Sequence, residues 1–124
     1  MARLLIGSSL KMYFGHRQTL DWVRAVAAIC TEHPATVSGA VEFFVIPTFP
    51  SIPAVVEIAR PAGIAVGAQD LHWADSGPFT GEVSAAELAE LGCTLAEVGH
   101  AERRSLFGET DEMVAGKTHA ALRH

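Results

Sequence analysis

The residues best suited to chemistry follow a short apolar run, Thr94–Val98, which predicts a buried strand. His100 comes directly after this run, and Glu102 lies two positions further on. A histidine at the end of a buried strand is held rigidly and still faces a ligand, so it suits proton transfer or polarisation of a carbonyl. A histidine bonded only to the backbone is the structural alternative. For Glu102 the structural alternative is an ion pair with a neighbouring cation.

Lys11 is a second candidate, because it follows the first apolar run, Leu4–Gly7. An ammonium group at a strand end holds a phosphate or carboxylate as a point charge. A solvated loop lysine is the alternative. Lys11 approaches His100 only if the sheet curls, and in a closed eight-stranded barrel both side chains point into the same opening. Glu102 is then placed to orient Lys11 by pairing with it.

The elements that must position these groups alternate along the chain. Near-continuous apolar character predicts strands that are covered on both faces. The expected strands are Leu4–Gly7, Val41–Ile46, Ile64–Gly67 and Thr94–Val98. The expected helices are Thr19–Cys30, Ala54–Ala59 capped by Ser51, the segment from the capping residue Ser84 to Leu91, and Thr110–Leu122. Strand–helix alternation predicts a parallel sheet with right-handed crossovers in one domain spanning residues 1–124.

Composition excludes several classes of function. The 124 residues are 49% hydrophobic and 19% charged, which is typical of a folded domain, and the net charge of −5 argues against nucleic acid as a partner. No apolar run has the length of a membrane helix, and the first residues lack the length of a signal peptide. The two cysteines, Cys30 and Cys93, match no metal or redox spacing, so we expect reduced thiols and a cytoplasmic protein.

A long loop, Gln69–Val83, follows the third expected strand and therefore lies at the carboxyl end of the sheet, where α/β enzymes place their sites. Trp73 and Phe79 are costly to expose on a loop, so it either folds back or docks on another chain. Its acids and His72 lack the spacing of metal ligands, and no metal is expected.

Four segments together resemble the triosephosphate isomerase family. Ser9-Leu10-Lys11-Met12 resembles the family's Asn-Trp-Lys-Met, and Val98–Arg104 resembles its Gly-His-Ser-Glu-Arg-Arg motif. The loop from Gly67 to Ser84 is similar to the family's third loop, and Phe107–Glu112 to its Phe-Gly-Glu-(Ser/Thr)-Asp. The likeness is in register from Leu4 to about Leu122, and four such motifs in order are highly specific.

The resemblance implies an α/β fold of the TIM-barrel type, with only the first four βα units of the barrel in residues 1–124. It implies an aldose–ketose isomerase of a small sugar phosphate that acts through an enediolate without a cofactor. Lys11 and Ser9 would bind the substrate, His100 would polarise its carbonyl, and Glu102 would pair with Lys11. Phe79 and Thr80 would lie on a dimer loop, with Thr80 reaching a partner's site in a homodimer.

The sequence departs from the family's pattern at several positions. Ser9 replaces an asparagine, Leu10 a tryptophan and Ala101 a serine, while Asp70 stands where asparagine is usual. These changes resemble the erythrulose-phosphate isomerases of the same superfamily, so a tetrose phosphate is the alternative to the triose phosphate. The departure at Ser9 puts the family's substrate contact there in question.

The family's catalytic glutamate, which follows the sixth strand, has no match here. A general base contributes about 10²–10⁴ in rate, so we expect residues 1–124 alone to be nearly inactive and to need the C-terminal half of the barrel. Two open sheet edges also invite pairing. An inert half-barrel module that acts by self-association is therefore the alternative from another functional class.

Overall fold

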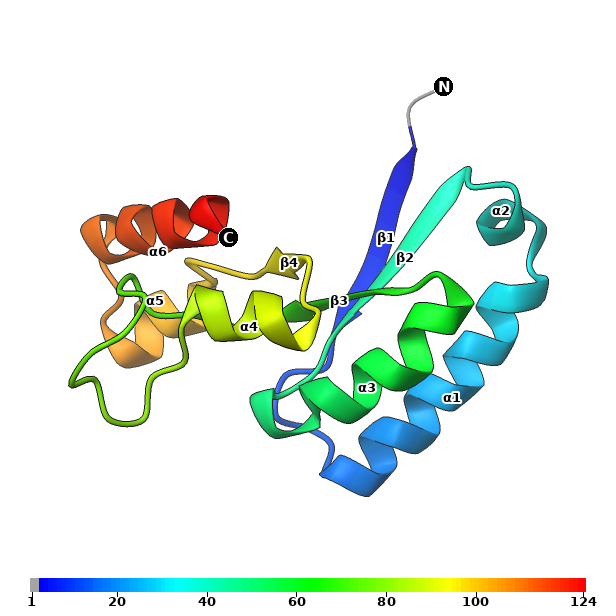
Figure 1. Cartoon of the computed structure of the whole chain (residues 1–124), viewed down its shortest axis with the longest axis horizontal. Helices are drawn as coiled ribbons and strands as arrows, with labels where there is room; N and C mark the ends of the chain where they lie inside the picture. The colour runs from blue at the N-terminus through cyan, green and yellow to red at the C-terminus, as the bar shows by residue number, and fades with distance from the viewer. Residues whose placement is uncertain (1–2) are drawn as a thin grey trace.

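The computed structural model describes residues 3–124, which form four parallel strands, each followed by one or more helices (Figure 1). The elements in chain order are β1 (Leu4–Ser9), α1 (His16–Glu32), α2 (Pro34–Val37), β2 (Val41–Ile46), η1 (Phe49–Ser51), α3 (Ile52–Ala59), η2 (Arg60–Ala62), β3 (Ala65–Ala68), α4 (Ala85–Leu91), β4 (Leu95–Ala96), α5 (Ala101–Phe107) and α6 (Asp111–Arg123). The predicted alternation of strands and helices is confirmed.

The strands lie in the sheet in sequence order, β1-β2-β3-β4, and every pair is parallel. Helices α1 and α3 pack against each other beside this sheet (Figure 1). The hydrophobic core joins them to the strands through Val23 of α1, Val55 of α3, Val45 of β2 and Val66 of β3, each at most 3% exposed. This α/β architecture is half of a TIM-type barrel.

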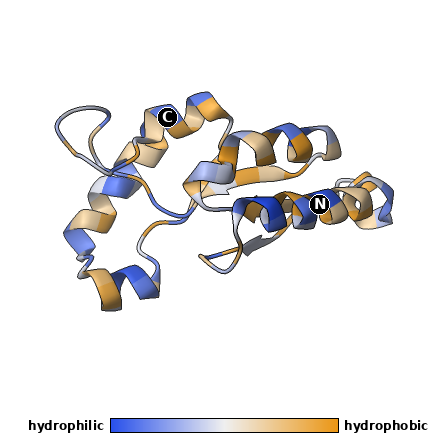
Figure 2. Ribbon diagram, turned by 90° about the horizontal axis from the view of Figure 1, so that it is seen from below, coloured by the Kyte–Doolittle hydropathy of each residue, from blue (hydrophilic) through white to orange (hydrophobic). Residues whose placement is uncertain are grey.

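The prediction that the strands are covered on both faces is wrong for β1. Leu4, Leu5 and Ile6 are 60%, 65% and 50% exposed, although they alternate between the two faces of the strand. The reason is that β1 is an outer strand of an open sheet, so both of its faces lack part of their cover. Figure 2 shows that the helices carry both polar and apolar residues.

The face of the sheet opposite α1 and α3 brings small and large residues together. A Cβ atom built on Gly7 would lie 2.4 Å from the Phe44 ring, and one on Gly67 would lie 2.2 Å from Leu95 Cδ1. These glycines let the neighbouring large side chains lie across the strands. Side chains alternate along a strand. Ser9, two positions beyond Gly7, and Glu97, two positions beyond Leu95, therefore continue the same face.

Local sequence signals set both ends of α4 and the start of α6. The Ser84 hydroxyl accepts the Glu87 N–H at 3.1 Å, and α4 ends at Gly92, which has a φ of +105°. The Thr110 hydroxyl accepts the Met113 N–H at 3.2 Å and caps α6, whose first turn contains two acids as predicted.

Three expectations about the helices need correction. Ser51 makes no side-chain capping bond, because η1 places its backbone in the helical region (φ −91°, ψ −10°) and its hydroxyl bonds His16 Nδ1 at 2.8 Å instead. Helix α1 begins at His16 rather than Thr19. The short helices α2 and α5 were not predicted, and α5 begins immediately after His100.

Within residues 3–124 we find no helix that combines the length and apolar character needed to cross a membrane. The same residues contain no group of three or more His, Cys, Asp or Glu side chains arranged to hold a metal ion. Cys30 is buried and Cys93 is half-buried, and both are free thiols.

Candidate active site

A cavity of about 360 Å³ lies where the strands end. Residues that follow all four strands contribute to it, as expected for a site at the carboxyl edge of a parallel sheet. Its polar lining includes Ser9, Lys11, Gln69, Glu97, His100 and Glu102. The cavity therefore contains all the catalytic and substrate-binding residues predicted from the sequence, together with Gln69 and Glu97, which the sequence analysis gave no role.

Lys11 has an unusual backbone conformation. Its φ is +53°, the only positive φ of a non-glycine residue among those described. Such a conformation persists only where the surroundings fix it, and it is commonest at functional sites. The Gln69 amide supplies this constraint, because Nε2 donates to the Lys11 carbonyl at 2.9 Å and to the Ile46 carbonyl at 3.3 Å. Gln69, directly after β3, thus ties together the ends of β1 and β2.

The Lys11 ammonium donates to Glu102 Oε1 at 2.7 Å, so the predicted ion pair is present. This hydrogen bond raises the pKa of Lys11 and lowers the pKa of Glu102. Both groups are therefore charged at neutral pH. Glu102 lies in the first turn of α5, and the pairing fixes the ammonium beside the cavity.

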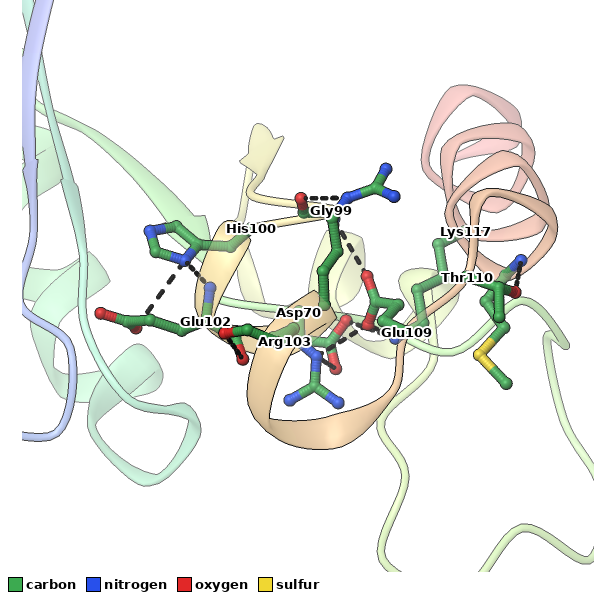
Figure 3. Close-up of polar contacts among 11 residues, drawn as sticks. Asp70, Gly99, His100, Glu102, Arg103, Glu109, Thr110 and Lys117 are labelled. Atoms are coloured by element: carbon green, nitrogen blue, oxygen red, sulfur yellow. Dashed lines mark hydrogen bonds and ion pairs between the residues drawn. The ribbon is translucent and has the colours of Figure 1, made fainter.

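His100 is the N-cap of α5, and its Nδ1 accepts the Glu102 N–H at 3.0 Å (Figure 3). A nitrogen that accepts this bond carries no proton, so a neutral ring must hold its proton on Nε2. The side chain is 28% exposed, and Nε2 lies 3.4 Å from Glu97 Oε1. The structure therefore presents an N–H donor in the cavity, held in one orientation by the start of a helix.

A buried network of four charges lies beside His100 (Figure 3). Lys117 Nζ donates to Asp70 Oδ1 at 2.8 Å and to Glu109 Oε2 at 2.7 Å. Arg103 Nε lies 3.0 Å from Asp70 Oδ2 and 2.8 Å from Glu109 Oε2. Asp70, Glu109 and Lys117 are at most 8% exposed. Two cations and two carboxylates balance, and they join the loop after β3 to α5 and α6.

The network also holds the peptide that precedes His100. Glu109 Oε1 accepts the Gly99 N–H at 3.1 Å, and Arg104 Nε donates to the Gly99 carbonyl at 2.9 Å. Gly99 has a φ of +68°, and a Cβ atom there would lie 2.9 Å from Val114 Cγ1. Conformation and space both favour glycine at this position, and the two bonds fix the turn that presents His100.

The loop after β3 folds back on the chain and still exposes part of its aromatic surface. The buried ring of His72 packs against Trp73 and Phe79, with centroids 4.2 Å and 4.3 Å away. Trp73 and Phe79 remain 41% and 40% exposed. Among residues 3–124, the cavity lining includes neither Phe79 nor Thr80. Thr80 itself is exposed.

The family model for triosephosphate isomerase matches residues 4–124. The chain belongs to the triosephosphate isomerase family. The predicted resemblance is therefore confirmed, and so is the predicted similarity to the erythrulose-phosphate branch, since relatives of both kinds match.

The chain is 52% identical over 122 residues to a protein named L-erythrulose-1-phosphate isomerase from Pectobacterium atrosepticum. The aligned segment covers 98% of this chain and 47% of that relative. It is 40% identical over 124 residues to a protein named triosephosphate isomerase from Synechococcus sp. strain JA-2-3B'a(2-13), covering 100% of this chain and 50% of the relative. The crystal structure of triosephosphate isomerase from Bartonella henselae has a TM-score of 0.86 at 32% identity, over 98% of this chain and 48% of that one.

The chain thus spans about half the length of the relatives it matches. Of the residues that the sequence analysis did not single out, Glu97 had the clearest signal, because it is a charged residue inside an otherwise apolar run. Gln69 gave no comparable signal. Its role depends on backbone carbonyls that lie 23 and 58 positions away in the sequence.

Proposed function

We propose that these residues form the N-terminal half of an eight-unit barrel and that the whole protein is a sugar-phosphate isomerase. The observation that carries the proposal is the pairing of a fixed ammonium, Lys11, with a neutral imidazole, His100, in one cavity. Membership of the triosephosphate isomerase family supports the reaction class. The coverage of about half of each relative supports the need for a second half.

In the proposed reaction, a base removes a proton from the carbon next to the substrate carbonyl. The electron pair of the broken C–H bond forms the carbon–carbon double bond of an enediolate, and negative charge develops on the carbonyl oxygen. His100 Nε2–H donates to this oxygen, and Lys11 stabilises the charge and binds the phosphorylated substrate. In triosephosphate isomerases a neutral histidine beside a helix N-terminus polarises the substrate carbonyl, and His100 at the start of α5 has this arrangement.

Glu102 acts through Lys11, whose ammonium it positions at 2.7 Å. Ser9 contributes a substrate contact from the end of β1. The general base comes from the C-terminal half of the barrel, in line with the resemblance described above. On this proposal residues 1–124 alone are nearly inactive. The whole protein works without a cofactor, as a cytoplasmic homodimer in which the loop bearing Phe79 and Thr80 contacts the partner.

Two substrates fit the family, namely a triose phosphate and a tetrose phosphate. The sequence motifs alone predict the triose phosphate. The higher identity to the Pectobacterium atrosepticum protein, at 52% against 40% for the Synechococcus protein, favours L-erythrulose 1-phosphate. We therefore place the tetrose phosphate first and keep the interconversion of glyceraldehyde 3-phosphate and dihydroxyacetone phosphate as the second candidate.

The test is to assay the purified whole protein with L-erythrulose 1-phosphate and with glyceraldehyde 3-phosphate. His100→Gln should lower kcat about 10²- to 10³-fold with a small change in KM, because the lost donor acts mainly in the transition state. His119→Gln, an exposed position on α6, is the matched control and should leave kcat unchanged. Turnover of neither substrate, or full activity of the His100 variant, would refute the proposal.

The alternative of an inert half barrel that associates with a second copy has support in the exposed strand residues Leu4, Leu5 and Ile6. Light scattering and an activity assay on residues 1–124, together with the length of the encoding gene, separate the association module from the isomerase. A stable dimer that lacks isomerase activity, from a gene that encodes no further βα units, supports the association module. A gene that encodes four more units and an active product supports the isomerase.

A further inference from the structure

Glu97 is a carboxylate of the cavity to which the reaction described above assigns no role. It directly follows β4, where its N–H donates to the Ala68 carbonyl at 2.8 Å and continues the sheet ladder. It shares a face with Leu95, two positions earlier, whose side chain lies across Gly67. Its side chain is 22% exposed, and Oε1 lies 3.4 Å from His100 Nε2. Glu97 is therefore next to the atom that would polarise the substrate carbonyl.

Ser9 gives a second, independent observation in the same cavity. Its hydroxyl oxygen is buried and has no hydrogen-bond partner among residues 3–124. A buried hydroxyl without a partner destabilises the fold, so native structures rarely keep one without a reason. The cavity that Ser9 lines has a volume of about 360 Å³ and offers room for a polar group of a ligand. A substrate hydroxyl is the partner that restores the missing bond.

Charge limits what Glu97 binds. A carboxylate accepts hydrogen bonds and donates none, and it repels the phosphate of a sugar phosphate. The phosphate must therefore lie away from Glu97, and a hydroxyl at the opposite end of the substrate is the donor that suits it. Lys11 carries the positive charge of the cavity, and its pKa is raised by the hydrogen bond to Glu102 and further by the charge of Glu97.

We propose that Glu97 and Ser9 recognise a substrate hydroxyl beyond the reacting carbons and so select a four-carbon over a three-carbon sugar phosphate. The inference rests on the isomerase function proposed above and deepens it. L-erythrulose 1-phosphate differs from dihydroxyacetone phosphate by one hydroxymethyl group, at the end remote from the phosphate. This group is the one that reaches a carboxylate beside His100.

The experiment compares kcat/KM for L-erythrulose 1-phosphate and dihydroxyacetone phosphate in the whole protein. Glu97→Val should lower the four-carbon to three-carbon ratio about 10- to 100-fold, the effect of losing a hydrogen bond to a charged group. Ser9→Ala should lower it about 5- to 10-fold. Glu97→Gln keeps an acceptor of the same size and should lower the ratio less than Glu97→Val. Glu112→Gln, on the exposed side of α6, is the control and should leave the ratio unchanged.

An unchanged ratio in the Glu97 and Ser9 variants overturns the inference. An equal fall for both substrates also overturns it, because it shows a general effect on the site. If the wild-type protein turns over neither substrate, the proposed isomerase function fails and this inference fails with it. An active wild type with an unmoved ratio removes the inference alone. Circular dichroism establishes folding, and if Glu97→Val does not fold, the nearly isosteric Glu97→Gln and the small change Ser9→Ala decide the question.

Discussion

Replacing Lys117 by methionine tests the buried charge network most directly. Lys117 is 5% exposed and bonds Asp70 and Glu109 at 2.8 Å and 2.7 Å. Breaking a buried ion pair by removing one partner costs about 3–5 kcal/mol, because a charge is left without compensation. Arg103 still contacts both carboxylates in the variant, so we expect the lower end of this range, about 3 kcal/mol. Methionine keeps most of the volume of the lysine side chain, so the substitution leaves little empty space and adds little further destabilisation.

The free energy of unfolding lost in Lys117→Met should depend on pH. Burial by itself raises the pKa of Glu109, but the hydrogen bonds from Lys117 and Arg103 outweigh it and the pKa is lowered. A lowered pKa means that Glu109 contributes stability above its ordinary pKa and loses this contribution as the pH falls through its value in the folded state. A protonated Glu109 needs no cation, so the difference in the free energy of unfolding between wild type and Lys117→Met should narrow as the pH falls.

Equilibrium urea unfolding followed by circular dichroism, at pH 7 and at pH 3, measures both effects. Arg24→Met is the matched control, because Arg24 forms a surface pair with Asp21 at 3.2 Å and both side chains are more than half exposed. We expect this control to change the free energy of unfolding by less than about 0.5 kcal/mol. A loss below about 1 kcal/mol for Lys117→Met at pH 7, or an equal loss at both pH values, would refute the reasoning.

Three further predictions follow from single positions. Gly67→Ala should lower the free energy of unfolding by about 1–3 kcal/mol, because the added methyl group meets a leucine side chain. Thermal denaturation measures the loss. Gly15→Ala is the control and should change the stability little, because its methyl group enters open space. Lys11→Met should raise the pKa of Glu102, and an unchanged carboxyl titration by NMR would contradict the ion pair. The pKa of Cys93 is raised by burial to about 11, so at pH 8 iodoacetamide should alkylate it about 100-fold more slowly in the folded than in the unfolded chain. Equal rates would show that the thiol is not protected.

The sequence predicted the order of strands and helices because short apolar runs and capping residues are local signals. Ser84 and Gly92 delimit α4 as expected. Helix α5 was missed because no serine, threonine, aspartate or asparagine marks its start, and His100 fills that position instead. Ser51 was assigned a cap by its type alone, while the preceding turn η1 decided its conformation.

The candidate site likewise contains some residues that the sequence predicted and others that it did not. Lys11 and His100 were predicted from their positions after strands, and the likeness to a family supplied their roles. The network of Asp70 and Lys117 was not predicted, because the two are 47 positions apart and meet only in the folded chain. The positive φ of Lys11 was also beyond local rules, since lysine has no preference for that conformation and distant groups impose it.

Gln69 has a consequence for how the site responds to salt. The ion pair of Lys11 with Glu102 is partly open to water, so dissolved ions screen it and the ammonium becomes freer as ionic strength rises. The amide of Gln69 carries no charge, and its bonds to the Lys11 and Ile46 carbonyls are insensitive to such screening. The lysine is therefore fixed at its backbone under all salt conditions and adjustable only at its tip. A high ionic strength should therefore weaken the binding of an anion by the Lys11 ammonium and leave the Lys11 backbone in place.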